Sequence, residues 1–231
     1  MRHRLLMMLL LWAGVTTSAQ TVLQQFAAVS AGAGEVTDMD LPRATSQGSV
    51  LIAMPGLLSP GVTVLSVTDN AASGGNTYKQ VPNSISACAD LPLDIWYCEN
   101  CKAGVTELKY HLSGHVKASI TAFLEVSNMA FSSVVDGGGV QVSNRVGTSE
   151  GLEVGPSLTT AATDFVIARY STAVPLPTAV TPSIWTFKTT YVYALNAPPG
   201  TYQPTLIGAK PGSSFCMSMA AFKIRPAGTS H

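Results

Sequence analysis

The chain has 231 residues, of which 46% are hydrophobic and 11% are charged, and its 13 basic side chains balance 13 acidic ones. Disordered chains have the opposite composition, so we expect a folded protein with a substantial core. A formal net charge of zero gives no electrostatic reason to expect nucleic acid or an anionic membrane surface as a partner.

The first residues have the order of a secretory signal peptide. Arg2 and Arg4 precede an apolar run at 5–15, and small and polar residues follow at 16–19. The run is too short to span a bilayer, which takes about 20 residues. We therefore predict a signal peptide at 1–19, cleaved after Ala19. The remaining chain is expected to be secreted, periplasmic or held at the cell surface, with no membrane insertion after cleavage.

Residues 20–34 are ambiguous, because their apolar positions fit a short helix that the AGAG sequence would end. Beyond them the apolar residues recur with a period of two, and glycine, proline and Asx residues mark turns. In 105–112, for example, Leu108, Tyr110 and Leu112 alternate with polar residues. We expect strands at 49–54, 61–68, 76–81, 95–98, 105–112, 117–127, 140–143, 164–170, 184–195 and 216–224.

About ten strand candidates joined by turn-rich segments predict an all-β fold, an antiparallel β-sandwich that is jelly-roll-like. After the leader the sequence shows no convincing helix and no clear internal repeat. The predicted domain organisation is the signal peptide at 1–19 followed by a single β-sandwich domain at 20–231.

Three stretches follow one another as a polar hairpin, a tyrosine strand with a glycine turn, and a closing A-F-K-like strand. Their residues are Asp69, Gly75, Asn76 and Tyr78, then Tyr97, Asn100, Gly104 and Val105, then 218–224. In this order the chain resembles an uncharacterised group of secreted bacterial and phage-associated β-sandwich domains. The resemblance covers most of 50–224, implies the fold, and brings no catalytic residues. The chain departs from that pattern at Cys98 and Cys101, and at Val126 and Asn128.

Four cysteines, Cys88, Cys98, Cys101 and Cys216, follow the predicted leader. Export places them in an oxidising compartment, so disulfides are the expected state. Of the three pairings that four cysteines allow, we favour Cys88 with Cys98 or Cys101, which leaves Cys216 the remaining partner. A redox-active C-x-x-C pair needs a helix N-terminus that this segment lacks, and a four-thiolate zinc site needs two paired knuckles, whereas Cys88 and Cys216 are solitary.

Two patterns point to hydrolytic chemistry. Residues 147–151 match G-x-S-x-G around Ser149, but a nucleophile elbow needs a following helix that the downstream Gly-Pro pair prevents, so we expect a polar turn. Paired carboxylates act on glycosides when they lie about 5–10 Å apart across a cleft. Glu125 interrupts an apolar strand, and we expect it to face solvent. The acids considered are Glu107, Glu125, Asp136 and Asp164.

Metal binding has little support in the sequence. His111 and His115 are four residues apart, a spacing that aligns two ligands on a helix but separates them by about 13 Å on a strand. Oxygens of Asp69, Asn70 and Asn76 have the chemistry of calcium ligands, although Asx-rich turns usually bond their own backbone. We predict no cofactor and keep calcium as the alternative.

An aromatic strand is the candidate ligand-binding site. Several of its rings have odd numbers and would share one face of a continuous strand at 184–195. Exposed rings in such a row stack on sugars, whereas alternating aromatic residues are more often core. A turn at Lys188 and Thr189 would split the row. The predicted binding residues are Trp185, Tyr191 and Tyr193 of this strand, joined by Tyr202 from the loop at 199–202.

The predicted compartment, the predicted fold and the aromatic row together favour a secreted non-catalytic binding module. Its expected ligand is an extracellular polysaccharide. One alternative is a structural or adhesive surface protein that packs against other proteins, and another is a hydrolase using carboxylates or Ser149. Binding demands an exposed Trp185 or Tyr191, assembly demands an uncovered apolar patch or sheet edge, and catalysis demands a pocket where acids converge. Sandwiches host all three functions, and we favour a protein that is not an enzyme.

Overall fold

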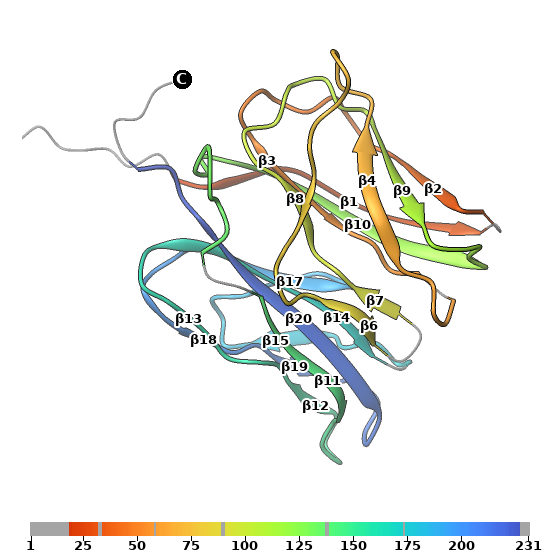
Figure 1. Cartoon of the computed structure of the whole chain (residues 1–231). Coiled ribbons are helices and arrows are strands. Elements are labelled where there is room, and N and C mark those ends of the chain that lie inside the picture. The colour runs from red at the N-terminus through yellow and green to blue at the C-terminus, as the bar shows by residue number, and fades with distance from the viewer. Residues whose placement is uncertain are drawn as a thin grey trace, which may run out of the picture.

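The computed structural model describes residues 19–31, 34–57, 59–88, 91–136, 139–172 and 174–226. Every regular element in these ranges is a strand, and paired strands run antiparallel (Figure 1). The predicted all-β antiparallel class is therefore confirmed. The predicted signal peptide lies outside the described residues except for Ala19. In the described ranges no helix has the length and apolar character needed to cross a membrane.

The strands fall into two sets that follow one another along the chain. The first set is β1 (Thr21–Ala31), β2 (Val36–Asp40), β3 (Val50–Met54), β4 (Val64–Asp69), β5 (Lys79–Gln80), β6 (Ile85–Cys88), β7 (Leu91–Leu93), β8 (Trp96–Cys98), β9 (Glu107–Leu112) and β10 (Ala118–Ser127). The second set is β11 (Val140–Val146), β12 (Leu152–Val154), β13 (Leu158–Thr160), β14 (Asp164–Thr172), β15 (Ala179–Thr181), β16 (Thr186–Phe187), β17 (Tyr191–Ala197), β18 (Gly200–Tyr202), β19 (Thr205–Ile207) and β20 (Ser214–Lys223).

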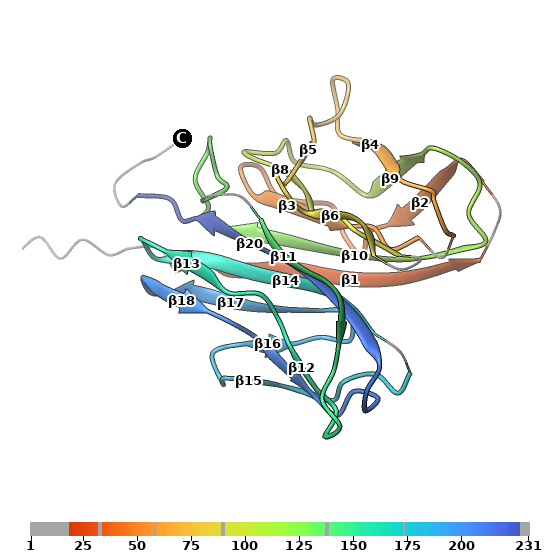
Figure 2. The same cartoon turned by 60° about the horizontal axis from the view of Figure 1, so that its bottom comes forward.

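The main sheets stack as four layers, numbered I to IV in the order in which they pack on one another. Layer I has the strand order β2-β9-β4, and layer II has the order β1-β10-β3-β8-β5. Layer III has the order β11-β20-β14-β17-β16, and layer IV has the order β12-β19-β15. Figure 2 shows β1 and β10 of layer II above β14 and β17 of layer III. Two further pairs, β6–β7 and β13–β18, complete the strands.

The two halves of the chain repeat one strand order. In each five-stranded sheet the first strand of the half forms one edge, and the last strand of the half lies beside it. Strands β11, β12, β14, β15, β16, β17, β19 and β20 take the places of β1, β2, β3, β4, β5, β8, β9 and β10. The chain therefore builds two sandwiches of the same order, although the sequence shows no clear repeat. The jelly-roll-like connectivity stays a prediction.

Each sandwich has its own core. Tyr110 and Phe123 are fully buried between layers I and II, and Leu206 and Met217 are fully buried between layers III and IV. In the outer layers only one face of a strand is covered, so β9 alternates half-buried and buried residues. This alternation is the period of two that predicted the strand.

A third core joins the two sandwiches across layers II and III. It includes Ile52 and Leu124 of layer II with Phe165 and Phe222 of layer III, and the Tyr97 and Phe222 rings meet edge to face at 5.7 Å. Strands β3, β10, β14 and β20 are therefore buried on both faces, and nearly all their residues are buried. A common core therefore links the two halves of the chain. The single domain at 20–231 stays a prediction.

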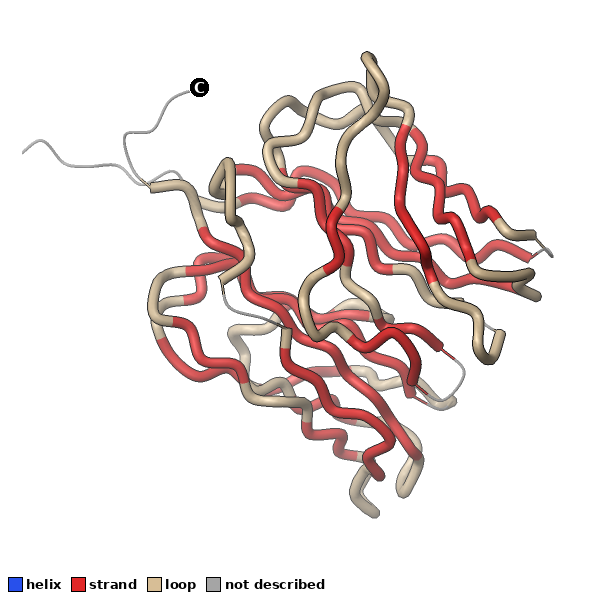
Figure 3. Tube along the Cα trace, in the orientation of Figure 1, coloured by secondary structure: helices blue, strands red, loops and turns tan. Residues whose placement is uncertain are grey.

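Figure 3 marks the strands in red along the chain. Several of them differ from those expected from the sequence. The ambiguous segment at 20–34 contains the long strand β1. The expected strand at 184–195 is two strands, β16 and β17, separated by a turn at 188–190. Strands of three residues, such as β12 and β13, were not expected, because they are too short to show a period.

Candidate functional site

The outer edge of β1 is open. β1 pairs with β10 on one side, and no described backbone group pairs with its other side between Gln25 and Val29. Within this segment Phe26 is 37% exposed and Val29 is 73% exposed. An unpaired edge presents N–H and C=O groups that can pair with another strand. We call residues 25–29 the open edge.

The other edges of layers II and III have features that discourage strand pairing. Strands β5 and β16 have two residues each, and β11 contains Arg145 at a register shift. In contrast, β1 has 11 residues without a charge or a proline, and its register shift at Val22/Gln24 precedes the open edge. Of these four edges, only β1 combines length, an uncharged sequence and exposed apolar side chains.

The beginning of β1 is fixed by contacts with both halves of the chain. The Gln20 amide N donates to Asn196 Oδ1 at 3.0 Å, and the Asn196 amide N donates to Gln20 Oε1 at 2.7 Å. The Arg43 guanidinium donates to the carbonyl of Leu23 and so covers the edge at that point. The strand is therefore anchored at its start and uncovered in its second half.

Glu125 also anchors β1. Its side chain is 1% exposed, its Oε2 accepts a hydrogen bond from Gln24 Nε2 at 2.8 Å, and its Oε1 accepts one from the Ser46 amide at 2.6 Å. The prediction that Glu125 faces solvent is wrong, because β1 and the segment around Ser46 cover this position of β10. A buried carboxylate with two such bonds is a structural group.

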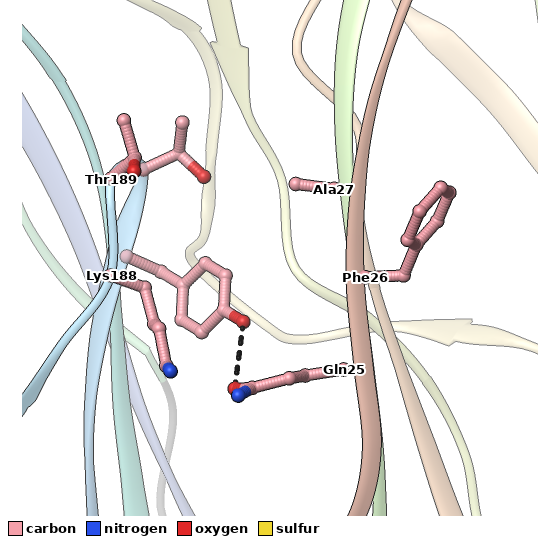
Figure 4. A pocket seen from close by; sticks show the side chains of 7 residues that line it. Gln25, Phe26, Ala27, Lys188 and Thr189 are labelled. Atoms are coloured by element: carbon pink, nitrogen blue, oxygen red, sulfur yellow. Dashed lines mark hydrogen bonds between the residues drawn. The ribbon is translucent and has the colours of Figure 1, made fainter. Parts of the chain in front are cut away.

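A shallow groove lies beside the open edge, between β1 and the turn that joins β16 to β17 (Figure 4). It has a volume of about 190 Å³ and is lined by 25–27 and 188–191. The Tyr191 hydroxyl donates to Gln25 Oε1 at 3.3 Å across it. Ala27 points into the groove, and Phe26 points to the opposite side of the strand. Pockets for small organic ligands are larger, roughly 300–1,000 Å³.

The four predicted binding aromatics are buried. Trp185, Tyr191, Tyr193 and Tyr202 are each at most 7% exposed. The turn at 188–190 divides the row: Tyr191 and Tyr193 lie in the core between layers II and III, whereas Trp185 and Tyr202 lie in the core of the second sandwich, with ring centroids 6.3 Å apart. These four rings therefore lack the exposure that stacking on a sugar requires. They are core residues, which is the alternative that the sequence offered for them.

The structure brings two of the predicted acids together. Burial and the neighbouring Asp136 raise the pKa of Asp164 to about 7, and Lys223 Nζ lies 3.7 Å from Asp136 Oδ1. Asp164 is fully buried, and no acid lines the groove beside β1. Glu107 is on layer I, where it pairs with Lys109 at 3.0 Å. No pocket of converging acids supports glycoside hydrolysis among these residues.

Ser149 and the histidines lie in ordinary surface environments. Ser149 is exposed in a turn that the Thr148 hydroxyl closes by accepting from the amides of Glu150 and Leu152. His111 contacts the Thr68 hydroxyl at 2.9 Å, and His115 lies 3.6 Å from Glu35 Oε1. In the described ranges no three His, Cys, Asp or Glu side chains form a metal-binding group.

The residues considered for calcium hold a loop together. Asp69 accepts four hydrogen bonds, from the amides of Ala71 and Asn76, from Asn76 Nδ2 and from the Tyr78 hydroxyl, at 2.8–3.0 Å. Asn70 Oδ1 accepts from the amides of Thr106 and Glu107. These oxygens are occupied by donors of the protein. The geometry thus favours the backbone-bonding interpretation of this Asx-rich turn over a cation site.

The preferred disulfide pairing is wrong. Cys98 and Cys101 bond to each other, because the turn after β8 returns the chain within reach of its own strand. Both are nearly completely buried, and no helix follows them to activate a thiol. Cys216 is also disulfide-bonded, and the side chain of Cys88 lies outside the described residues. The prediction of disulfides as such is confirmed for Cys98, Cys101 and Cys216.

Comparisons with protein-family models, with curated proteins and with solved structures found no match for this chain. The site therefore rests on the geometry alone. Sequence reasoning missed the open edge because 20–34 looked ambiguous. The signal was present in the composition of β1, which has 11 residues without charge, proline or glycine.

Proposed function

We propose that the protein is a secreted, non-catalytic structural protein that assembles with copies of itself by pairing strand β1 edge to edge. The observation that supports this proposal is the open edge, an uncharged and partly apolar stretch of an 11-residue edge strand. Natural proteins usually protect such edges with charges, proline, bulges or short length. An edge without protection in its second half is suited to strand addition.

The chemistry of the open edge favours a second copy as its occupant. Antiparallel pairing of β1 with β1 of another chain brings no like charges together at any register, because the strand carries none. Such pairing is symmetric, as most contacts between identical chains are. It would join two copies of layer II into one continuous sheet, with the exposed Phe26 and Val29 covered in the process.

Carbohydrate binding is the second candidate function. The groove beside β1 offers Gln25, Lys188, Thr189 and the Tyr191 hydroxyl as hydrogen-bonding groups. A glycan array with the wild-type protein and a Lys188→Ala variant tests this candidate. Binding that the substitution removes would favour it over self-assembly.

The assembly proposal is tested by placing a charge on each of two exposed valines. Val29 lies on the open edge, and Val146 is a matched control on β11, the corresponding edge strand of the second half, with 65% exposure against 73%. Surface changes at such positions alter stability by no more than about 0.5 kcal/mol. Sedimentation equilibrium of wild type, Val29→Lys and Val146→Lys measures self-association.

We expect Val29→Lys to weaken self-association by at least about tenfold, which corresponds to about 1.4 kcal/mol, and Val146→Lys to leave it unchanged. The reason is that pairing would force the new ammonium group into the interface. A monomeric wild-type protein, or equal association of the two variants, would contradict the proposal.

A further inference from the structure

A small pocket lies at the junction of the two sandwiches and shares Thr189 and Thr190 of the β16–β17 turn with the groove beside β1. It has a volume of about 90 Å³. The residues that line it are Ile120, Arg169, Tyr170, Ser171, Thr172, Leu176, Thr189 and Thr190. Apart from Arg169 none of these is ionised at neutral pH, and several carry hydroxyl groups.

Arg169 is the unusual member of this set, because it is a charged side chain that is only 3% exposed. Its Nη1 donates to the carbonyl of Thr190 at 2.7 Å, and its Nη2 donates to the carbonyl of Ile120 at 3.1 Å. Ile120 belongs to the first half and Thr190 to the second, so the guanidinium spans the junction. Its Nε is buried without a hydrogen-bond partner.

The backbone leaves room for this guanidinium at Gly56. A Cβ atom built at Gly56 would lie 2.7 Å from Arg169 Nη2 and 2.5 Å from the Ile120 carbonyl oxygen. Both distances are too short for real atoms. Any side chain at this position would therefore push the guanidinium away from the carbonyl that it contacts.

The charge of Arg169 has no anionic partner among the described residues, where the ion pairs involve other side chains. Its two acceptors are neutral carbonyls. Burying an ion without a counter-ion is costly, and the cost falls when an anion with good geometry is supplied. Burial lowers the pKa of Arg169 to about 10, so the side chain is still a cation at neutral pH.

We propose that the pocket lined by Arg169 binds a small carboxylate anion, held by the guanidinium and by the hydroxyl groups around it. A guanidinium offers five N–H donors in a planar fork that fits a carboxylate, and the two carbonyls accept from only one N–H each of Nη1 and Nη2. The volume of about 90 Å³ exceeds the share of one water, about 30 Å³, and is far below that of an ordinary ligand pocket. It accommodates a carboxylate with little attached to it.

The test titrates the purified protein with sodium acetate, and with sodium chloride at equal ionic strength as the control. Binding is followed by the unfolding temperature and by line broadening of ¹³C-labelled acetate. Arg169→Lys removes the fork but keeps a positive charge, and Arg145→Lys is the matched change at an exposed arginine. Leu176→Trp fills the pocket from its rim and leaves the guanidinium in place, so it serves if Arg169→Lys does not fold.

We expect acetate to raise the unfolding temperature with saturation, chloride not to do so, and Arg169→Lys or Leu176→Trp to lose the broadening of the acetate signal. Arg145→Lys is expected to behave as wild type. Titration with a glutamate whose amino and α-carboxyl groups are blocked distinguishes the two sources of the carboxylate. A pocket that admits an acidic side chain binds the blocked glutamate, whereas a pocket that admits only a free small acid does not. Equal effects of acetate and chloride, or unchanged acetate binding in both pocket variants, would overturn the proposal.

Discussion

Asp94 and Asp164 are carboxyl groups that the fold keeps away from water. Burial raises the pKa of Asp94 to about 7 against the opposing hydrogen bond from Gln80, and burial together with Asp136 raises that of Asp164 to about 7. In the unfolded chain both would titrate near pH 4. Between these values the folded protein binds more protons than the unfolded chain.

The free energy of unfolding is therefore predicted to fall as the pH rises from about 4 to about 7, and the contribution of these groups levels off above that. For Asp94 the effect is at most about 4 kcal/mol. Denaturant titrations across this range measure it, with Asp94→Asn as the comparison. The difference between wild type and variant should change with pH in this window and be constant above it. A difference that is independent of pH would show that folding does not raise the pKa of Asp94.

The Cys98–Cys101 disulfide closes a very short loop. Chain entropy then predicts a stabilisation of about 2 kcal/mol, which the Cys98→Ser, Cys101→Ser double variant should lose in a denaturant titration. Peptide mapping without reduction is expected to find the two cysteines joined within one peptide. Finding either of them joined to Cys88 would instead support the pairing favoured from the sequence.

At the scale of elements, Glu125 ties β10 to β1 and to the segment around Ser46. Glu125→Ala leaves the Gln24 amide and the Ser46 N–H without their acceptor, so we predict a loss of about 2–4 kcal/mol. Glu125→Gln keeps one acceptor and should lose less. Chemical denaturation measures both, and amide exchange in β1 should rise in the alanine variant. Wild-type stability of Glu125→Ala would contradict this structural role.

The elements show what the sequence could and could not predict. Strand β9 was predictable because only one of its faces is covered, so burial and polarity alternate. In β1 the register shift at Val22/Gln24 interrupts that alternation, which is why 20–34 also fitted a helix. The aromatic row failed for a related reason. The turn at 188–190 moves Trp185 to the opposite side of layer III from Tyr191, and the sequence offered a turn at Lys188 and Thr189 only as an alternative to a continuous strand.

Contacts between distant segments were beyond sequence reasoning altogether. The open edge, the junction at Arg169 and the pairing of Asp136 with Asp164 each depend on which sheets stack. The alternation of apolar and polar residues predicts which residues are buried, but it does not predict which other strand or sheet they pack against. For this reason the all-β class was correct from sequence, whereas the repeated strand order and the site became apparent only with the topology.

At the scale of the whole molecule, the core between layers II and III couples the two sandwiches. Phe222 is fully buried there and packs its ring 5.7 Å from that of Tyr97 and 6.2 Å from that of Phe165. Phe222→Ala is predicted to cost about 3–5 kcal/mol. Trp96 lies in the core of the first sandwich and Trp185 in that of the second.

Single-tryptophan variants that retain Trp96 or Trp185 therefore report on each half separately. We expect their fluorescence transitions to coincide in the wild-type background, and both to shift together in Phe222→Ala. Coincident probes are the signature of one cooperative unit. Two separate midpoints would mean that the halves unfold independently and that residues 20–231 are not a single domain.

Copies of the chain are proposed to meet at the open edge of β1. Amide hydrogen exchange, recorded at low and at high protein concentration, tests it most directly, because pairing protects backbone N–H groups that are otherwise free. We predict that the amides within residues 25–29 that point away from β10 exchange quickly in dilute protein and become protected as concentration rises, while those of β11 do not change. Unchanged exchange in β1 over a range in which the protein associates would contradict the claim and place the contact elsewhere.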